Sequence, residues 1–137
     1  MAQIPVKENS RPGDEESFFS VSHWREGDAL FLSLQGEVDM HTVGELHRAI
    51  TEGLQDGVCT HVVADMSRVP FIDSTGYSAF VAATQTLRAR GEGRVNLAGC
   101  QPVIVRVLGI VRLNRMFGIH DSLEQARKSL SRQTNPV

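Results

Sequence analysis

Residues 63–76 read VADMSRVPFIDSTG, and this stretch contains the change of chain direction that decides the fold. An apolar strand at residues 62–66 is followed by a turn and by a second apolar pair, residues 71–72, which leads into Asp73. Asp and Ser are the residues that most often cap the unpaired N–H groups at a helix start. We therefore expect a buried strand, a turn, and then a long helix that begins at Asp73 or Ser74.

The same junction places hydroxyl groups at a helix start. If Asp73 is the cap, Ser74 is the first helical residue and its hydroxyl is free; if Ser74 is the cap, its hydroxyl is occupied but still lies at the surface. In both cases Ser74 or Thr75 lies where the helix dipole favours negative charge. The residues are thus compatible with an ordinary capped helix or with a site of phosphoryl transfer. Gly76 either keeps the helix start open to a partner or is a tolerated first-turn glycine.

Composition restricts the classes of function. The chain has 137 residues, 22% of them charged and 41% apolar, which is typical of one soluble globular domain. The formal net charge is -2 and there is no basic run, so no nucleic-acid partner is expected. No apolar stretch approaches the roughly 20 residues that span a bilayer, and the N-terminus lacks the apolar core of a secretory signal. We therefore expect a cytoplasmic protein without a membrane partner.

Alternating apolar and polar residues predict a β-hairpin near the N-terminus. Its strands lie in residues 18–24 and 30–35, and a charged turn that contains Gly27 joins them. In the second strand the leucines at positions 30, 32 and 34 point one way, whereas Phe31 points the other way. This pattern predicts a hairpin with only one buried face.

Four helices and two more strands are expected after the hairpin. Thr42 and Glu45 predict a capping box for the first helix, and Gly57 ends that helix. Residues 60–66 are typical of a strand covered on both faces, residues 94–98 of its parallel neighbour, and residues 111–117 of a connector. The other helices are expected to bury Tyr77, Phe80, Val81, Thr84 and Leu87 in the second, Val103, Ile104, Val107 and Leu108 in the third, and Leu123, Ala126 and Leu130 in the fourth.

This order of elements predicts an α/β protein in which helices cover a short sheet. The single domain is expected at residues 17–131, between a mobile N-terminal tail at residues 1–16 and a C-terminal tail at residues 132–137. Cys59 precedes one strand and Cys100 follows its parallel neighbour. The two thiols are therefore expected to be free and to lie at opposite ends of the sheet.

Catalytic motifs are weak in this chain. It lacks a glycine-rich phosphate loop, and the Gly-x-Ser-x-Gly elbow of a nucleophilic serine is absent around Ser74. The five histidines have no metal-ligand spacing, so neither a metal nor a cofactor is expected. Asp39, Asp65 and Asp73 would be the acidic residues of an enzyme or small-ligand binder, but Asp at the ends of strands more commonly caps loops. We therefore do not expect an enzyme.

Several blocks of the sequence resemble the STAS domain of bacterial anti-sigma factor antagonists. In the order of that family they are GEVD at residues 36–39, VVADMS at 62–67, FIDSTG at 71–76 and LNRMF at 113–117, before Asp121 and Ser122. The resemblance runs from about Leu30 to Leu130, and the Asp-Ser-Thr-Gly block is its most specific element. It implies the STAS fold, a short mixed β-sheet covered by about four α-helices.

The resemblance also implies a partner-switching function. In that family the serine that matches Ser74 is phosphorylated by a cognate anti-sigma factor, a serine kinase of the histidine-kinase-like ATPase fold. The unphosphorylated form binds this kinase and releases the sigma factor, and a PP2C-type phosphatase removes the phosphate. By position, Ser74 is the phosphoacceptor and Thr75 the second choice. The partner-binding residues are Asp73, Ser74, Thr75, Gly76, Tyr77 and Asp39, and Tyr77 stands where an aliphatic residue is commoner.

Phosphorylation of Ser74 is expected to act at the partner interface and to leave the fold intact. A phosphoryl group adds about -1.5 to -2 charges, which a helix start favours by about 0.3–1 kcal/mol, so the domain is expected to stay folded. A hundredfold loss of affinity requires only about 2.7 kcal/mol, and desolvation of a dianion supplies this. One alternative remains open, in which the domain is a non-phosphorylated STAS subunit of a larger signalling or lipid-transport complex.

Overall fold

Five strands form one mixed sheet in the computed structural model, which describes residues 18–134 of the chain. The strands are β1 (Ser20–Glu26), β2 (Ala29–Gln35), β3 (His61–Arg68), β4 (Val95–Ala98) and β5 (Gly118–His120), and their order in space is the order along the chain. β1 is antiparallel to β2, and all the other neighbours are parallel. The carboxyl ends of the parallel strands therefore lie at the same end of the sheet.

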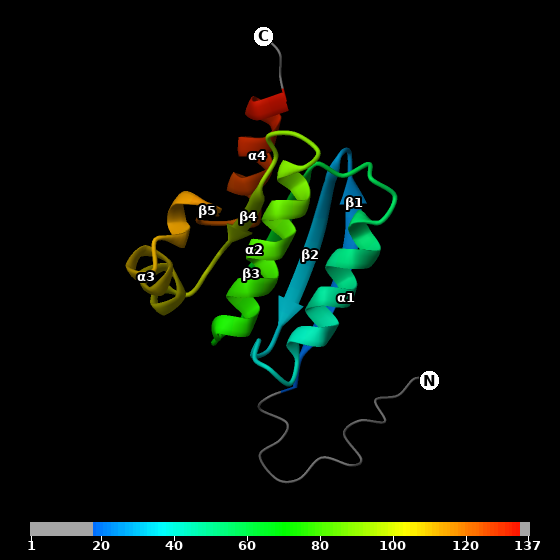
Figure 1. Cartoon of the computed structure of the whole chain (residues 1–137). Helices are drawn as coiled ribbons and strands as arrows, with labels where there is room; N and C mark the ends of the chain where they lie inside the picture. Colours follow the sequence, from blue (N-terminus) through cyan, green and yellow to red (C-terminus); the bar gives the residue numbers. More distant parts are fainter. Residues whose placement is uncertain (1–17, 135–137) are drawn as a thin grey trace.

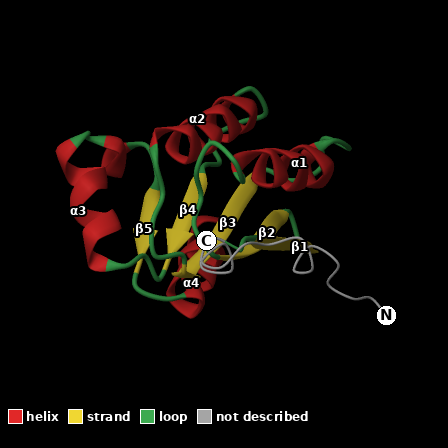
Figure 2. Ribbon diagram, turned by 90° about the horizontal axis from the view of Figure 1, so that it is seen from below, coloured by secondary structure: helices red, strands yellow, loops and turns green. Residues whose placement is uncertain are grey.

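Four α-helices pack around this sheet (Figure 1). They are α1 (Val43–Leu54), α2 (Ser74–Arg88), α3 (Pro102–Ile110) and α4 (Leu123–Thr134), with one 3₁₀ turn, η3 (Leu113–Arg115), after α3. α1 and α2 lie on one face of the sheet, α4 lies on the other, and α3 stands beside the β5 edge (Figure 2). The predicted fold class is therefore confirmed.

Both faces of β2 are buried, so the prediction of a hairpin with one buried face is wrong for this strand. The leucines at positions 30, 32 and 34 belong to the large core beneath α1 and α2. Phe31 is only 1% exposed and packs with Val63 and Ala126 in a second core beneath α4. Trp24 stacks on the Phe31 ring with 5.6 Å between ring centroids, and the Arg127 guanidinium carbon lies 5.0 Å from the Phe31 centroid.

The last part of the domain differs from the prediction in two ways. The expected connector is followed by strand β5, which pairs Gly118 with Asn96 and His120 with Ala98 at the edge of the sheet. Three residues are too few to show the alternation by which strands are found in a sequence. α4 continues to Thr134, beyond the domain end predicted at residue 131. The predicted tail at residues 1–16 lies outside the described residues.

Only part of the predicted inner face of α3 is buried. Ile104 and Leu108 are 2% and 0% exposed, as expected. Val103 is 55% exposed, so its predicted inward position is wrong, and Val107 is half-buried. α3 stands at the edge of the sheet, and an edge helix contacts the core along a narrower stripe than a helix that crosses the middle.

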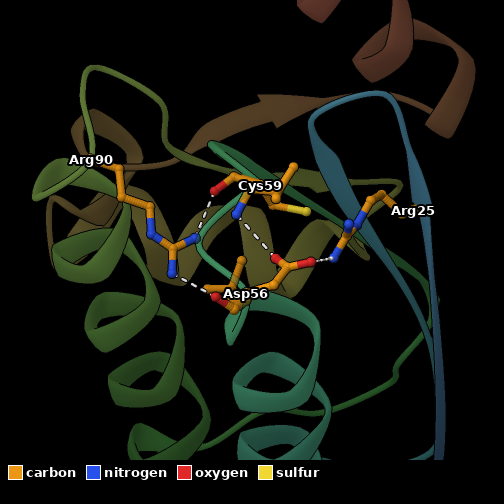
Figure 3. A network of polar contacts seen from close by, with 6 residues as sticks. Arg25, Asp56, Cys59 and Arg90 are labelled. Atoms are coloured by element: carbon orange, nitrogen blue, oxygen red, sulfur yellow. Dashed lines mark hydrogen bonds and ion pairs between the residues drawn. The ribbon is translucent and has the colours of Figure 1, made fainter.

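A side chain that follows α2 by two residues, Arg90, holds the end of α1 (Figure 3). The Arg90 guanidinium donates to the carbonyl oxygen of Leu54 at 2.5 Å and to that of Cys59 at 2.7 Å. Arg25 and Asp56 form an ion pair at 2.7 Å beside this contact. The Cys59 thiol is free and buried here, whereas the free thiol of Cys100 follows β4 at the other end of the sheet, as predicted.

Candidate functional site

Asp73 caps α2 and leaves the hydroxyl of Ser74 free. The Oδ1 atom of Asp73 accepts hydrogen bonds from the backbone N–H groups of Thr75 at 2.9 Å and Gly76 at 3.3 Å. Ser74 is therefore the first helical residue; it is exposed, and within residues 18–134 its hydroxyl has no hydrogen-bond partner. Of the two caps that the sequence left open, the structure has Asp73.

Thr75 is held differently from Ser74. Its hydroxyl donates to Asp73 Oδ1 at 2.5 Å, and its side chain is half-buried. This hydrogen bond is the main reason that the pKa of Asp73 is lowered, with smaller contributions from the backbone N–H groups of Gly76, Thr75 and Met40. The Asp73 carboxylate therefore stays ionised and occupies the Thr75 hydroxyl, and the Ser74 hydroxyl is the more available of the two.

A short parallel bridge fixes the start of α2 against the loop after β2. The Val38 N–H donates to the Phe71 carbonyl at 3.0 Å, and the Asp73 N–H donates to the Val38 carbonyl at 3.0 Å. A Cβ at Gly76 would lie 2.7 Å from Val38 Cγ1 and 2.5 Å from Ile72 Cγ1. Gly76 is thus buried and faces inward, so the prediction that it keeps the helix start open to a partner is wrong. Its missing side chain allows α2 to approach the bridge.

Asp39 closes the loop next to this bridge. Its Oδ1 accepts from the backbone N–H groups of His41 at 2.9 Å and Thr42 at 3.1 Å. The Thr42 hydroxyl accepts from the Asp39 N–H at 3.0 Å and donates to the Glu37 carbonyl at 2.9 Å. It makes no cap hydrogen bond, so the predicted capping box with Glu45 is wrong. Asp39 therefore shapes the surface beside α2 through its loop.

The three aspartates of the enzyme hypothesis each serve their own loop. Asp65 Oδ1 accepts from the Ser67 N–H at 3.0 Å and from the Ser67 hydroxyl at 2.8 Å, much as Asp39 and Asp73 bind their neighbours. For Asp39 and Asp65 this confirms the prediction that they cap loops, whereas Asp73 caps α2. A cavity of about 570 Å³ lies at the other end of the sheet, where its lining includes Thr60 and His61. Across residues 18–134, no group of three or more His, Cys, Asp or Glu side chains is placed to hold a metal ion.

Two exposed apolar residues of this region were not selected from the sequence. Met40 is 70% exposed and Phe71 is 49% exposed, and they lie on the two loops that meet at Asp73. Tyr77 is half-buried one turn further along α2, and burial raises the pKa of its hydroxyl. The sequence gives no sign that Met40 and Phe71 are exposed, because folded proteins commonly expose apolar residues and no local pattern marks which ones.

A profile of the STAS domain matches residues 24–126, and the chain therefore belongs to the STAS domain family. The anti-sigma F factor antagonist of Paenibacillus polymyxa is 26% identical over 93 residues, which cover 68% of this chain and 79% of the relative. The anti-sigma-B factor antagonist of Staphylococcus aureus is 28% identical over 93 residues, which cover 68% of this chain and 84% of the relative.

Solved structures share the fold. An anti-sigma factor antagonist from Mycobacterium paratuberculosis superposes with a TM-score of 0.73 at 23% identity, over 82% of this chain and 94% of the other. The unphosphorylated form of the anti-sigma factor antagonist SpoIIAA gives a TM-score of 0.70 at 22% identity, over 88% and 99% of the two chains. The phosphorylated form of SpoIIAA from Bacillus gives 0.64 at 22% identity, over 82% and 99%. In the described part of the chain, no helix is long and apolar enough to cross a bilayer.

Proposed function

We propose that this protein is an anti-sigma factor antagonist and that phosphorylation of Ser74 switches it off. The unphosphorylated form binds a cognate anti-sigma factor, which is also a serine kinase of the histidine-kinase-like ATPase fold, and so releases the sigma factor. A PP2C-type phosphatase restores this form. The names of the Paenibacillus and Staphylococcus relatives support the class of function.

The observation that carries the switch is the free hydroxyl of Ser74. Asp73, and not Ser74, caps α2. Phosphorylation of Ser74 therefore breaks no hydrogen bond of the described fold. In the transfer step, the Ser74 Oγ bonds to the γ-phosphorus of ATP, the bond from that phosphorus to ADP breaks, and a base on the kinase takes the hydroxyl proton. In this proposal the kinase supplies the catalysis and the antagonist is the acceptor.

The phosphate then acts on the interface. At the start of α2 it is favoured by the helix dipole, so the domain stays folded. The neighbouring loops present Met40 and Phe71, which are exposed and apolar. A partner that packs against these side chains around a neutral hydroxyl would have to strip water from a dianion in the phosphorylated form, which is strongly unfavourable. Solved structures of SpoIIAA in unphosphorylated and phosphorylated forms support a switch of this kind in the fold.

The test is a phosphorylation assay followed by binding measurements. The protein is incubated with each candidate anti-sigma kinase and ATP, and intact mass and peptide mapping locate the modification. Wild type and Thr75→Ala should gain one phosphoryl group at Ser74, and Ser74→Ala should gain none. In binding assays Ser74→Ala should bind the kinase constitutively and Ser74→Asp weakly. Equal affinity of these two variants would contradict the switch, and a chain that is never labelled but purifies in a larger complex would indicate the subunit role.

A further inference from the structure

Helix α3 exposes an apolar strip at the edge of the sheet. Val103, Ile110 and Val111 are 55%, 70% and 52% exposed, and the buried residues of α3 are Ile104 and Leu108. Figure 2 shows α3 standing at the side of the layers, beside β5, with its outer side directed away from the sheet. Exposed aliphatic side chains that gather on one element are characteristic of interaction surfaces.

The same surface is cationic. Residues 94–120 contain four arginines and neither Asp nor Glu, although the whole chain has a formal net charge of -2. Arg106, Arg112 and Arg115 are exposed, and none of them forms an ion pair within residues 18–134. We call Val103, Arg106, Ile110, Val111, Arg112 and Arg115 the α3 surface. A partner that covers it without leaving unpaired charge must itself be acidic.

Arg112 adds a second observation. It has φ 66° and ψ 21°, and within the described residues it is the one non-glycine residue with positive φ. An L-residue with a long side chain adopts this left-handed conformation at a cost that glycine would avoid. A left-handed residue commonly follows the end of a helix, and here that position, directly after Ile110 and Val111, holds an arginine in place of the usual glycine.

Helix α3 begins at the same end of the sheet as the Ser74 site. β3 and β4 are parallel neighbours, so the loops that lead into α2 and α3 leave the same end of the sheet. Gln101, the residue before α3, donates its side-chain N–H to the Ser67 carbonyl at 3.3 Å, and Ser67 lies near the end of β3. A partner that covers the start of α2 therefore lies at the end of the sheet where α3 begins.

We propose that the α3 surface docks an acidic, partly apolar surface of the same anti-sigma partner that contacts Ser74. This inference rests on the proposed function and adds the chemistry of the partner. An acidic partner surface attracts Arg106, Arg112 and Arg115 and repels a phosphate on Ser74, so one charge distribution promotes binding of the unmodified form and opposes binding of the phosphorylated form.

An anionic membrane is the other class of surface that an apolar and cationic helix fits. α3 has only nine residues, and its exposed apolar residues are Val and Ile. Helices that lie in a membrane interface carry Trp, Phe or Leu on the apolar side and Lys or Arg on the polar side. The composition of α3 therefore favours a protein partner, and the membrane becomes one outcome of the test.

The test measures binding of the kinase that labels Ser74, at low and high salt. The charge-reversed variant Arg112→Glu/Arg115→Glu should bind about tenfold or more weakly, and its affinity should depend less on salt, because interfacial arginines are frequent hot spots and their attraction is screened. Ile110→Ser should weaken binding without changing the salt dependence. The matched control is Arg88→Glu, an exposed arginine at the far end of α2. It should bind like wild type.

The outcomes separate the two proposals. If both α3 variants bind the kinase with wild-type affinity and salt dependence, the proposed docking role of the α3 surface is wrong, but the proposed antagonist function is unaffected. If no anti-sigma kinase binds or labels the wild type, the proposed function is wrong, and the proposal that the α3 surface docks such a kinase is wrong too. If wild type binds phosphatidylglycerol vesicles and the α3 variants lose only that binding, the surface serves a membrane and the inference is overturned. Unfolding midpoints of all variants establish that the changes act on binding.

Discussion

The hydroxyl of Thr75 donates a hydrogen bond to the Asp73 carboxylate at 2.5 Å, so among the described residues the Thr75 hydroxyl is occupied whereas that of Ser74 is not. Asp73 and Thr75 hold the helix, and Ser74 between them has a free hydroxyl. A phosphoacceptor that also capped its helix would weaken the fold when modified. The separation of capping from modification allows the surface to change its charge while the domain stays folded.

Asp73 is expected to stabilise the domain in its ionised form. Its pKa in the folded state is lowered, so its contribution to the free energy of unfolding is complete above the ordinary value of 3.8 and is lost as pH falls through the folded-state pKa. Asp73→Ala should therefore be less stable than wild type at neutral pH, and the difference should shrink in acid. Denaturant unfolding over a pH series checks this, with Asp73→Asn as a variant that keeps one cap acceptor. A difference that is constant with pH would contradict the prediction.

Gly76 is expected to tolerate no side chain. The Cβ of Gly76→Ala would press on Ile72 and Val38 at 2.5–2.8 Å, and overpacking of this kind lowers the free energy of unfolding by about 1–3 kcal/mol. Gly44→Ala is the matched control, because Gly44 also lies in the first turn of its helix and a Cβ there meets nothing within 4 Å. That variant should gain about 0.5–1 kcal/mol. Equal effects of the two changes in thermal unfolding would show that the start of α2 is less tightly packed.

Arg90 is expected to hold the end of α1 against β3. Arg90→Ala leaves the Leu54 and Cys59 carbonyls without the guanidinium, and hydrogen bonds to a charged group contribute about 1.5–3 kcal/mol each. Because the side chain is half-buried, we expect a total loss of about 2 kcal/mol, whereas Arg88→Ala at an exposed position should change little. Arg90→Lys should be intermediate, since an ammonium lacks the planar fork that reaches both oxygens. Chemical denaturation measures all three variants.

Arg112 is expected to show opposite effects on stability and binding. Arg112→Gly relieves the left-handed conformation at φ 66° and should leave stability unchanged or raise it by up to about 1 kcal/mol. The same variant removes one arginine from the α3 surface and should weaken binding of the anti-sigma kinase. A loss of stability together with unchanged binding would indicate that Arg112 has a structural role.

His61 is expected to make the domain less stable in mild acid. Burial is the main cause of its lowered pKa, which nearby Asp28 raises and Arg94 lowers further. Among residues 18–134, its buried Nδ1 atom has no hydrogen-bond partner. Below the ordinary pKa of 6.5 the unfolded chain binds a proton that the folded site resists, so the free energy of unfolding should fall as pH drops from there to the folded-state pKa. His61→Gln should flatten this slope in urea unfolding over a pH series.

Local sequence patterns determined most of the secondary structure and, within the site, the helix start that carries Ser74. The helix start at Asp73 or Ser74, the surface position of Ser74, the buried strand β3 and the four helices follow from residues within a few positions of one another, because capping and hydrophobic periodicity are local interactions. The four sequence blocks, in the order found in the STAS family, predicted the STAS fold. These features were read correctly from the chain alone.

The tertiary structure decided the contacts between residues that are distant in the sequence. Gly76 meets Val38 because the bridge to Ile72 joins two loops, and Phe31 is buried because α4, from the other end of the chain, covers the second face of β2. β5 exists as a strand because β4 offers it a free edge. Whether a side chain such as Met40 or Ile110 is covered depends on which elements pack beside it, and that is a property of the assembled fold.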